Sequence, residues 1–342
     1  MDKILVCGAF DFGNPVGGGQ PVKTRELFYA LQKEYGKNNV SYIETWQWRK
    51  HPISLMKQVF SKGKKANKVI MLPAHNGVYV FSFLLYLLKK RFNISIYYDV
   101  IGGWLQDKVK NSWYLKFVLK YFDGIWVETN RMKIALNDLN LTNVKVVNNF
   151  KQLPIVSLND LPKEYLKPYK LCIFSRIMAE KGIDDIIKVL GRINSLDIKF
   201  TLDLYGMVSP EYQQHFDDLL NQFHKFISYK GFVNTHESIT VLKNYFCLIF
   251  PTKFYTEGIP GTIIDAYASG LPVICSNWMS AKDVVDDTQS GYLYEFDNTD
   301  ALYKLLEKIY NKPDMILSQK EYCLNKANEF RPNIVIKTIF EK

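Results

Sequence analysis

The densest set of residues that could do chemistry lies at residues 250–276, FPTKFYTEGIPGTIIDAYASGLPVICS. An apolar run ends at Pro251, and the next loop carries Glu257 and then GIPGT at 258–262, where a helix is expected to begin. Glycines allow close backbone approach, and a helix N-terminus favours a phosphate. Asp265 follows Glu257 by eight residues, so two carboxylates flank the loop and would suit a sugar and a ribose. Alternatively, Asp265 offsets the helix dipole and Glu257 is a surface charge.

Two cations occupy another loop, in the segment SRIMAEKG at residues 175–182. Arg176 and Lys181 lie where a predicted strand gives way to a helix. Arginine binds phosphate oxygens through two parallel hydrogen bonds, and lysine adds a point charge. The pair therefore suits a diphosphate, although such residues are more often solvated loop charges.

A run of three glycines, at 17–19, follows the apolar segment 3–10 and precedes a helix-like stretch beginning near Pro21. Proline suits a first helical position, and the glycines would let the backbone approach a phosphate or a sugar. The dinucleotide pattern GxGxxG is not met, because Val22 stands at its third glycine, and no GxxxxGK[ST] motif follows. A dehydrogenase or an NTPase of those types is disfavoured, and a flexible turn is the alternative interpretation.

Short apolar runs alternate with helical stretches along the whole chain, which predicts parallel sheets with helices on both faces. The expected strands are 3–10, 40–46, 68–73, 94–100, 124–129 and 144–150, and then 170–175, 200–206, 226–233, 245–251, 271–276 and 292–296. In the second half, helices are expected at 183–192, 210–224, 236–244, 262–269, 300–310 and 316–329.

Three prolines interrupt this alternation in the segment 152–169, which we interpret as a linker. The expected domains are 1–155 and 156–325, each Rossmann-like and doubly wound, with residues 326–342 packing back on the first. Ligands of such folds bind at the carboxyl ends of the strands, so two such edges are expected to face each other across an interdomain cleft.

Charge is distributed unevenly over the 342 residues, which contain 44 Lys and Arg and 34 Asp and Glu. Residues 1–160 hold 23 cations and 11 carboxylates, a net of +12, so this half carries the whole surplus and suggests an anionic partner. The five cysteines form no CxxC pair, which argues against a zinc or redox site and for a reduced compartment.

The ordered set GGG, SRxxxxKG, YG, KGFV and EGIPGTxxDAxAxGLPVI resembles the retaining glycosyltransferases of family 4, which have the GT-B fold. The resemblance spans nearly the whole chain and is strongest over residues 170–297. It implies that Arg176 and Lys181 hold the donor diphosphate and stabilise the leaving nucleotide in place of a divalent metal. It also implies that Glu257 binds donor sugar hydroxyls.

The same resemblance implies a donor site in which backbone groups cap the phosphates, Asp265 binds the ribose diol, and residues of the LYG and KGFV segments border the base. These donor-binding residues are Gly18, Gly19, Gly206, Phe232, Val233, Gly258, Ile259, Pro260, Gly261, Thr262 and Asp265. No metal and no cofactor beyond the nucleotide-diphosphate sugar, UDP- or GDP-linked, is expected. Transfer is expected to be dissociative, with retention of anomeric configuration and without a protein nucleophile.

Two positions depart from the family pattern. The second acid is Asp265, one methylene shorter than the usual Glu. Where many members carry a histidine near the anomeric carbon, this chain has YYDVIGGW, so Asp99 or a backbone group of residues 100–103 would stand there. His75, at the end of the preceding predicted strand, is a second candidate for the reacting centre.

Basic and aromatic residues interleave at 46–52, 57–68 and 81–92, as they do at membrane surfaces. The first domain is therefore expected to dock on the cytoplasmic leaflet and to take a saccharide or lipid-linked saccharide acceptor. No signal peptide is recognised, and the apolar stretch 78–88 would be about 16 Å long as a helix, half of a bilayer, so a cytoplasmic or peripheral protein is expected. The other interpretation of 81–90 is a buried crossover helix with a basic end.

Three rival functions remain open at this stage. A nucleotide-sugar epimerase shares the fold, but no extra acid or histidine accompanies Glu257. A basic nucleic-acid-binding protein fits the pI of about 9.1, but the charge is diffuse and no RNA-binding or zinc-finger motif is present, so no nucleic acid is expected. A catalytically inactive sensor of nucleotide sugars would fit the departures at Asp265 and Asp99.

Overall fold

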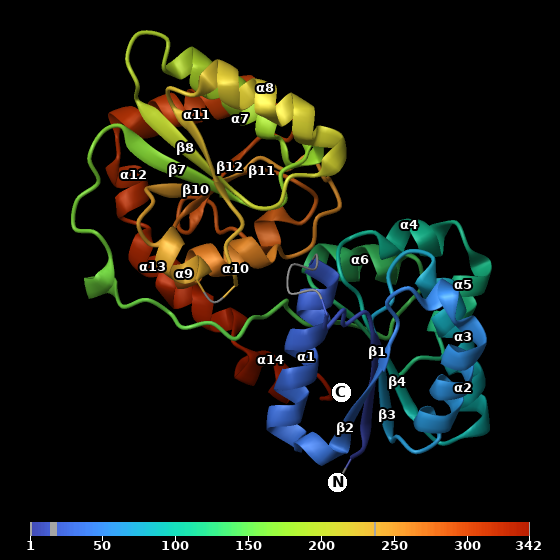
Figure 1. The fold of residues 1–342 in the computed structure, drawn as a ribbon. Coiled ribbons are helices and arrows are strands. Elements are labelled where there is room, and N and C mark those ends of the chain that lie inside the picture. The colour runs from blue at the N-terminus through green and yellow to red at the C-terminus, as the bar shows by residue number, and fades with distance from the viewer. Residues whose placement is uncertain (1, 14–18, 236, 342) are drawn as a thin grey trace. The chain divides into compact units, whose positions relative to one another are not determined.

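The computed structural model describes residues 2–13, 19–235 and 237–341. The chain forms two compact units (Figure 1). Unit 1 is Met1–Gln152 together with Phe330–Lys342, and unit 2 is Leu153–Glu329. Each unit has its own parallel sheet and its own core.

The sheet of unit 1 has six parallel strands in the order β2-β1-β3-β4-β5-β6. The strands are β1 (Ile4–Gly8), β2 (Val40–Glu44), β3 (Lys68–Met71), β4 (Ser95–Asp99), β5 (Gly124–Val127) and β6 (Val144–Val146). Its helices are α1 (Gly19–Tyr35), α2 (Pro52–Gly63), α3 (Gly77–Arg91), α4 (Leu105–Lys110), α5 (Trp113–Leu119), α6 (Asn130–Asp138) and α14 (Pro332–Thr338). The central strands are rich in Val and Ile because helices cover both of their faces.

The C-terminal helix α14 is part of unit 1 and packs against α1. Val335, Ile336 and Ile339 are buried in the same core cluster as Leu27 and Leu31 of α1. Burial of these aliphatic side chains fixes the end of the chain to the first unit.

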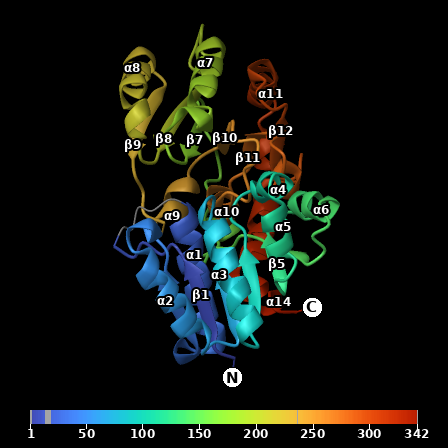
Figure 2. The ribbon, with the colours of Figure 1, turned by 90° about the vertical axis from the view of Figure 1, so that its right-hand side faces the viewer.

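The sheet of unit 2 also has six parallel strands, in the order β12-β11-β10-β7-β8-β9. The strands are β7 (Tyr169–Phe174), β8 (Phe200–Tyr205), β9 (Ile227–Gly231), β10 (Cys247–Phe250), β11 (Val273–Ser276) and β12 (Gly291–Tyr294). Its helices are α7 (Ile183–Ile193), α8 (Gln213–Phe223), α9 (Ser238–Leu242), α10 (Gly261–Ala268), α11 (Thr299–Asn311), α12 (Asp314–Leu317) and α13 (Lys320–Lys326). Helices α7, α8 and α11 cover one face of this sheet, and α9, α10 and α13 cover the other (Figures 1 and 2).

The predicted fold class is confirmed, since two α/β units with parallel sheets are present. All of the expected strands exist, with ends shifted by a few residues. The helix expected at 316–329 is instead split into α12, α13 and a 3₁₀ turn at Ala327–Phe330, and the first turn of the helix expected at 210–224 is a 3₁₀ turn at Pro210–Tyr212.

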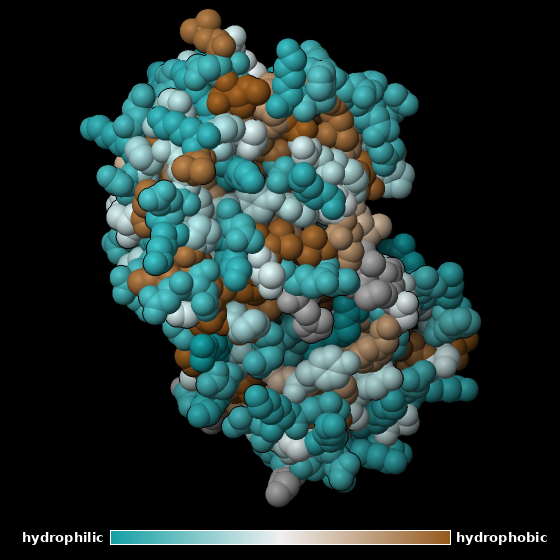
Figure 3. Space-filling view, turned by 60° about the vertical axis from the view of Figure 1, so that its left-hand side comes forward, coloured by the Kyte–Doolittle hydropathy of each residue, from teal (hydrophilic) through white to brown (hydrophobic). Residues whose placement is uncertain are grey.

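Polar side chains cover most of the face seen in Figure 3, with apolar ones interspersed, as is normal for a globular protein. The five cysteines are free and buried. Within the described residues, no helix combines the length and the apolar character needed to span a bilayer.

Candidate functional site

The candidate site of unit 2 lies at the point where its chain reverses the direction of sheet growth. From β7 the chain adds β8 and β9 on one side, and β10 then pairs with β7 on the other. The loops that follow β7 and β10 therefore leave the sheet side by side, at its carboxyl edge. Ligands of open α/β sheets bind at such a switch point.

The loops after β7 and β10 are joined backbone to backbone. Gly182 has φ +70°, and a Cβ built on it would lie 1.9 Å from the carbonyl oxygen of Pro251. The backbone N–H of Lys253 donates to the carbonyl oxygen of Glu180 over 2.8 Å. Only glycine allows this approach, so the conformation of one loop fixes the position of the other.

The loops after β7 and β8 are joined in a similar way. Gly206 has φ +137°, and a Cβ there would lie 1.9 Å from the carbonyl oxygen of Ser175. The Ile177 N–H donates to the Met207 carbonyl over 2.9 Å, and Ser209 returns a hydrogen bond of 2.9 Å to the Ile177 carbonyl. Gly206, which the sequence predicts to border the base, thus lets the loop after β8 pack closely against the loop that carries Arg176.

The structure brings Lys181 and Glu257 into direct contact. The Lys181 Nζ lies 2.7 Å from Glu257 Oε2, and Thr252 Oγ1 donates to the same oxygen over 3.2 Å. The Lys181 ammonium also lies 5.0 Å from the ring centroid of Phe254. Both side chains of the ion pair keep some exposure, 16% for Lys181 and 21% for Glu257, so a ligand can reach them.

Arg176 extends from the same loop into solvent. Its guanidinium forms no ion pair with a carboxylate in the part of the chain that the structure describes. An exposed arginine in this state can bind phosphate oxygens with both arms of its guanidinium, without first breaking an internal salt bridge.

Helix α10 begins at Gly261, directly after the loop of Glu257. Pro260 precedes it and contributes no side-chain cap to its first N–H groups. The Thr262 hydroxyl is buried and has no hydrogen-bond partner among the described residues. The first turn of α10 therefore keeps donors and a partial positive charge that suit an anion, beside the buried Gly258 and Ile259.

Three other donor-site predictions differ in their exposure. Asp265 lies in the second turn of α10 and is only 3% exposed. Its contact with the ribose stays a prediction, and burial of the carboxylate limits the surface that a ribose could reach. Phe232 is 45% exposed and Val233 is half-buried, just after β9. These two side chains are exposed enough to pack against the planar base of a nucleotide.

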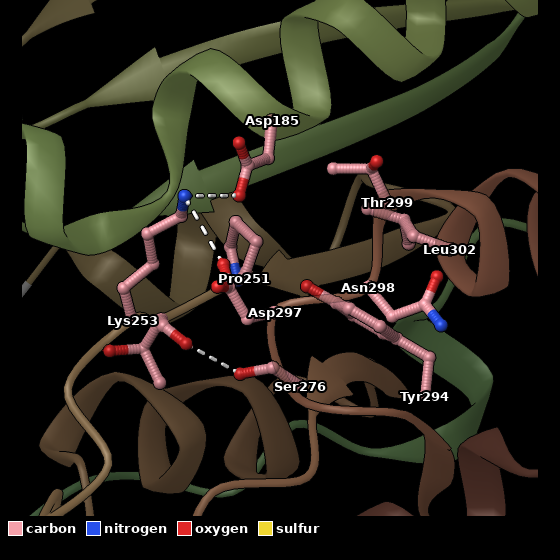
Figure 4. A pocket seen from close by; sticks show the side chains of 10 residues that line it. Asp185, Pro251, Lys253, Ser276, Tyr294, Asp297, Asn298, Thr299 and Leu302 are labelled. Atoms are coloured by element: carbon pink, nitrogen blue, oxygen red, sulfur yellow. Dashed lines mark hydrogen bonds and ion pairs between the residues drawn. The ribbon is translucent and has the colours of Figure 1, made fainter.

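A small pocket behind the Glu257 loop contains a cluster that the sequence did not predict (Figure 4). The Lys253 Nζ lies 2.9 Å from Asp185 Oδ2 and 3.3 Å from Asp297 Oδ1. The hydrogen bond that Lys253 donates to Asp185 raises the pKa of Lys253, with a further contribution from Asp297. Ser276 Oγ donates to the Thr252 carbonyl over 2.7 Å. The cluster anchors residues 252–253 to α7 and to the β12–α11 loop.

In unit 1, the predicted residue Asp99 is enclosed in a buried ion-pair network. Its Oδ1 lies 3.0 Å from the Nζ of Lys23, which also lies 2.8 Å from Glu128 Oε1, and all three side chains are at most 4% exposed. Burial raises the pKa of Asp99 against the opposing effect of Lys23. Burial alone would lower the pKa of Lys23, but the two carboxylates raise it to about 12. The Asp99 carboxylate is therefore not accessible to a reacting atom.

His75 is exposed, in contrast to Asp99, at the carboxyl end of the neighbouring strand β3. It adopts φ +50° and stacks on Trp104, with ring centroids 5.2 Å apart and planes 24° apart. The Trp104 Nε1 donates to the Ile101 carbonyl over 2.7 Å, which fixes the indole beneath it. Gly19 begins α1 with no atom near its Cβ position, and Gly18 lies outside the described residues.

Residues 160–329, about half of the chain, match the family model "Glycosyl transferases group 1". A protein from the cps region of Klebsiella pneumoniae is 24% identical over 80% of this chain and 70% of its own length. The GtfA subunit of a UDP-N-acetylglucosamine–peptide N-acetylglucosaminyltransferase from Streptococcus gordonii is 27% identical, but the match spans 49% of this chain and 33% of that protein.

Two solved structures share the fold. Anabaena HepE, crystallised with UDP, has a TM-score of 0.76 at 13% identity, covering 100% of this chain and 99% of that one. A sucrose-phosphate synthase from Thermosynechococcus elongatus has a TM-score of 0.76 at 13% identity, covering 99% and 97%. At these identities the likeness shows the fold alone, which is the GT-B fold.

Proposed function

The chain belongs to the group 1 glycosyl transferases, and from that premise we propose that it transfers a sugar from a nucleoside diphosphate sugar to a saccharide acceptor. The observation that supports this most is the arrangement at the carboxyl edge of β7 and β10. There, the exposed Arg176 and the Lys181–Glu257 pair lie on two interlocked loops, beside the first turn of α10, which the Pro260 side chain does not cap.

The donor diphosphate would bind to Arg176, Lys181 and the backbone N–H groups at the start of α10. These groups would stabilise the negative charge that develops on the leaving phosphate. Glu257 would then exchange part of its contact with Lys181 for hydrogen bonds to donor sugar hydroxyls. UDP and UDP-glucose complexes of HepE support a uridine nucleotide.

We propose that the reaction is metal-independent and retains the anomeric configuration. Arg176 and Lys181 would supply the positive charge that a divalent cation gives to other transferases. No protein nucleophile is required if the leaving phosphate and the acceptor share one face of the sugar. Of the two side chains predicted near the reacting carbon, the structure exposes His75 and buries Asp99, so His75 is the better candidate for contact with the sugar.

The acceptor is proposed to be a growing polysaccharide or a lipid-linked saccharide at the cytoplasmic face of the membrane. Relatives support this: the Klebsiella protein comes from a cps region, and a 28% identical match, over 40% of this chain, is the capsular polysaccharide glycosyltransferase CapM of Staphylococcus aureus. A peripheral enzyme would meet such an acceptor without spanning the bilayer.

The experiment is a donor panel in buffer with EDTA. UDP, GDP and their common sugars are added singly, and thermal unfolding is followed. A ligand at 100 times its Kd stabilises by about 2.7 kcal/mol, a shift of about 5–10 °C for a unit of this size. The donor so identified is incubated with lipid-linked saccharides, and the anomeric configuration of the product is read by NMR.

We expect one nucleotide to stabilise the protein in EDTA and its sugar to be transferred with retention. No shift with any nucleotide would contradict the donor site, and an epimerised nucleotide sugar as the sole product would contradict transfer.

A further inference from the structure

Helix α3 of unit 1 presents apolar side chains to solvent. Its inner positions, such as Phe81 and Leu85, are buried, yet Val80, Phe83 and Leu87 on its outer face are 36–43% exposed. The outer face of a surface helix is ordinarily polar, and a helix that is apolar all round belongs in a core or at a membrane. No described residue of unit 1 covers these three side chains, which keep 36–43% of their surface exposed.

Helix α5 extends the same apolar surface. Trp113 and Phe117 lie on its outer side, Tyr121 follows in the turn after the helix, and Trp113 is 81% exposed. The two helices pack side by side (Figure 2), with the ring of Tyr86 on α3 lying 6.0 Å from Phe117 and 5.1 Å from Tyr121. We call the exposed set Val80, Phe83, Leu87, Trp113, Phe117 and Tyr121 the α3–α5 ridge.

Cations surround the ridge. Residues 49–123 contain 14 Lys and Arg and three carboxylates; Asp99 is buried, Asp123 pairs with Lys89 over 2.5 Å, and Asp107 is the third. Lys90, Lys110 and Lys120 are exposed at the ends of α3, α4 and α5. The Lys90 ammonium lies 4.8 Å from the centroid of Tyr121, so part of this charge is held beside the ridge.

We propose that the α3–α5 ridge inserts into the interface of an anionic lipid bilayer, with the surrounding lysines on the headgroups. Amphipathic surfaces with exposed Trp, Phe and Leu and a basic border bind in this way. Nucleic acid would use the cations but gives no reason for outward Val80 and Leu87. This role rests on the proposed function, in which the acceptor is a lipid-linked saccharide. The α3–α5 ridge would bring unit 1 to the membrane that carries that acceptor.

The test is co-sedimentation of the full chain with vesicles of phosphatidylcholine containing 30% phosphatidylglycerol, and with phosphatidylcholine alone. We expect binding to the anionic vesicles, weakened by salt, and little to the neutral ones. The triple variant K90E/K110E/K120E should partition about 100-fold less into the anionic vesicles, because each lysine contributes a factor of about ten or less. K304E/K308E/K312E, on α11 of unit 2 and its C-cap, changes the net charge equally and should lose twofold or less.

An apolar variant tests insertion separately. F83S/L87S/F117S should lose at least tenfold in partition, whereas L166S/L196S/I198S, at exposed positions of unit 2, should bind as the wild type does. Tryptophan emission should shift to the blue on vesicle addition, and W113F should remove most of that shift while the protein still binds.

The proposal is overturned if the wild type ignores anionic vesicles at low salt, or if the ridge variants bind as well as their controls. It is also overturned if the ridge variants only convert a dimer into a monomer, since the occupant would then be a second copy. Nucleotide binding is measured on the same samples. Wild-type protein that binds nucleotide but not anionic vesicles contradicts the ridge alone, and wild-type protein that binds the vesicles but no nucleotide contradicts the donor site alone.

Discussion

Replacing Gly182 by alanine tests whether the two loops of the candidate site depend on each other. A Cβ at this position would lie 1.9 Å from the Pro251 carbonyl oxygen, so the loops must separate by about 1.1 Å to reach the 3.0 Å below which real contacts are not seen. Alanine in the left-handed region costs about 1–2 kcal/mol. The overlap, with the loosened hydrogen bond from Lys253 to Glu180, adds about 1–3 kcal/mol.

Gly231 supplies the matched control for backbone strain. It has φ +78°, but no atom of the described residues lies within 4 Å of its Cβ position, so Gly231→Ala should cost the strain alone. Unit 2 spans residues 153–329, and a unit of this size loses about 2–4 °C in Tm per kcal/mol. The overlap contributes about 1–3 kcal/mol beyond the strain, so we expect Gly182→Ala to unfold unit 2 about 2–12 °C below Gly231→Ala.

The assay is calorimetry of the two variants, followed by donor turnover. A displacement of about 1 Å at a reacting centre can lower the rate about 100-fold, so Gly182→Ala should lose activity on that scale even below its Tm. Equal Tm values for the two variants, with turnover of Gly182→Ala near the wild-type rate, would refute the argument that the loops are mechanically coupled.

Three further substitutions have expected outcomes. Glu257→Gln should lower kcat about 10–100-fold with little change in Tm, because a neutral amide binds sugar hydroxyls less strongly and leaves Lys181 unpaired; an unchanged kcat would contradict this. Lys253→Met should raise the donor KM several-fold while Tm moves by less than about 3 °C, because it frees the Glu257 loop from two carboxylates. Steady-state kinetics measures this, and an unchanged KM would show that the cluster has no positioning role. Burial lowers the pKa of Lys320 from 10.5 to about 8, so the unfolded chain binds its proton more tightly and stability rises with pH between about 8 and 10.5. Lys320→Met should therefore stabilise unit 2 by up to about 3 kcal/mol at pH 7. In urea unfolding, this gain in the free energy of unfolding should fade by pH 10. An equal gain at both pH values would contradict the lowered pKa of Lys320.

The strands were predictable because doubly covered parallel strands demand unbroken apolar runs, as in ILVCG of β1 and CLIF of β10. The break between α12 and α13 was not, since residues 314–329 contain neither glycine nor proline to mark it. Helix ends without such residues depend on tertiary packing, which local sequence does not record.

The candidate site divides along similar lines. Arg176, Lys181 and Glu257 stand out because each lies on a strand-to-helix loop beside glycines, and two of them meet in the structure. The Lys23–Asp99–Glu128 network was missed because its members are up to 105 residues apart and meet only when α1 closes over β4 and β5. That closure is also why Asp99, which looked available at a strand end, is buried.

The central claim is that the loops after β7 and β10 bind a nucleoside diphosphate through Arg176. Isothermal titration of the nucleotide found in the donor panel, in EDTA, tests it most directly. Arg192 is the control, since it is the other arginine of unit 2, lies at the far end of α7 and pairs with Asp300 over 2.6 Å. We expect Arg176→Ala to raise Kd by about 10–100-fold and Arg192→Ala to leave it unchanged. An unchanged Kd in Arg176→Ala, or an equal loss in both variants, would contradict it.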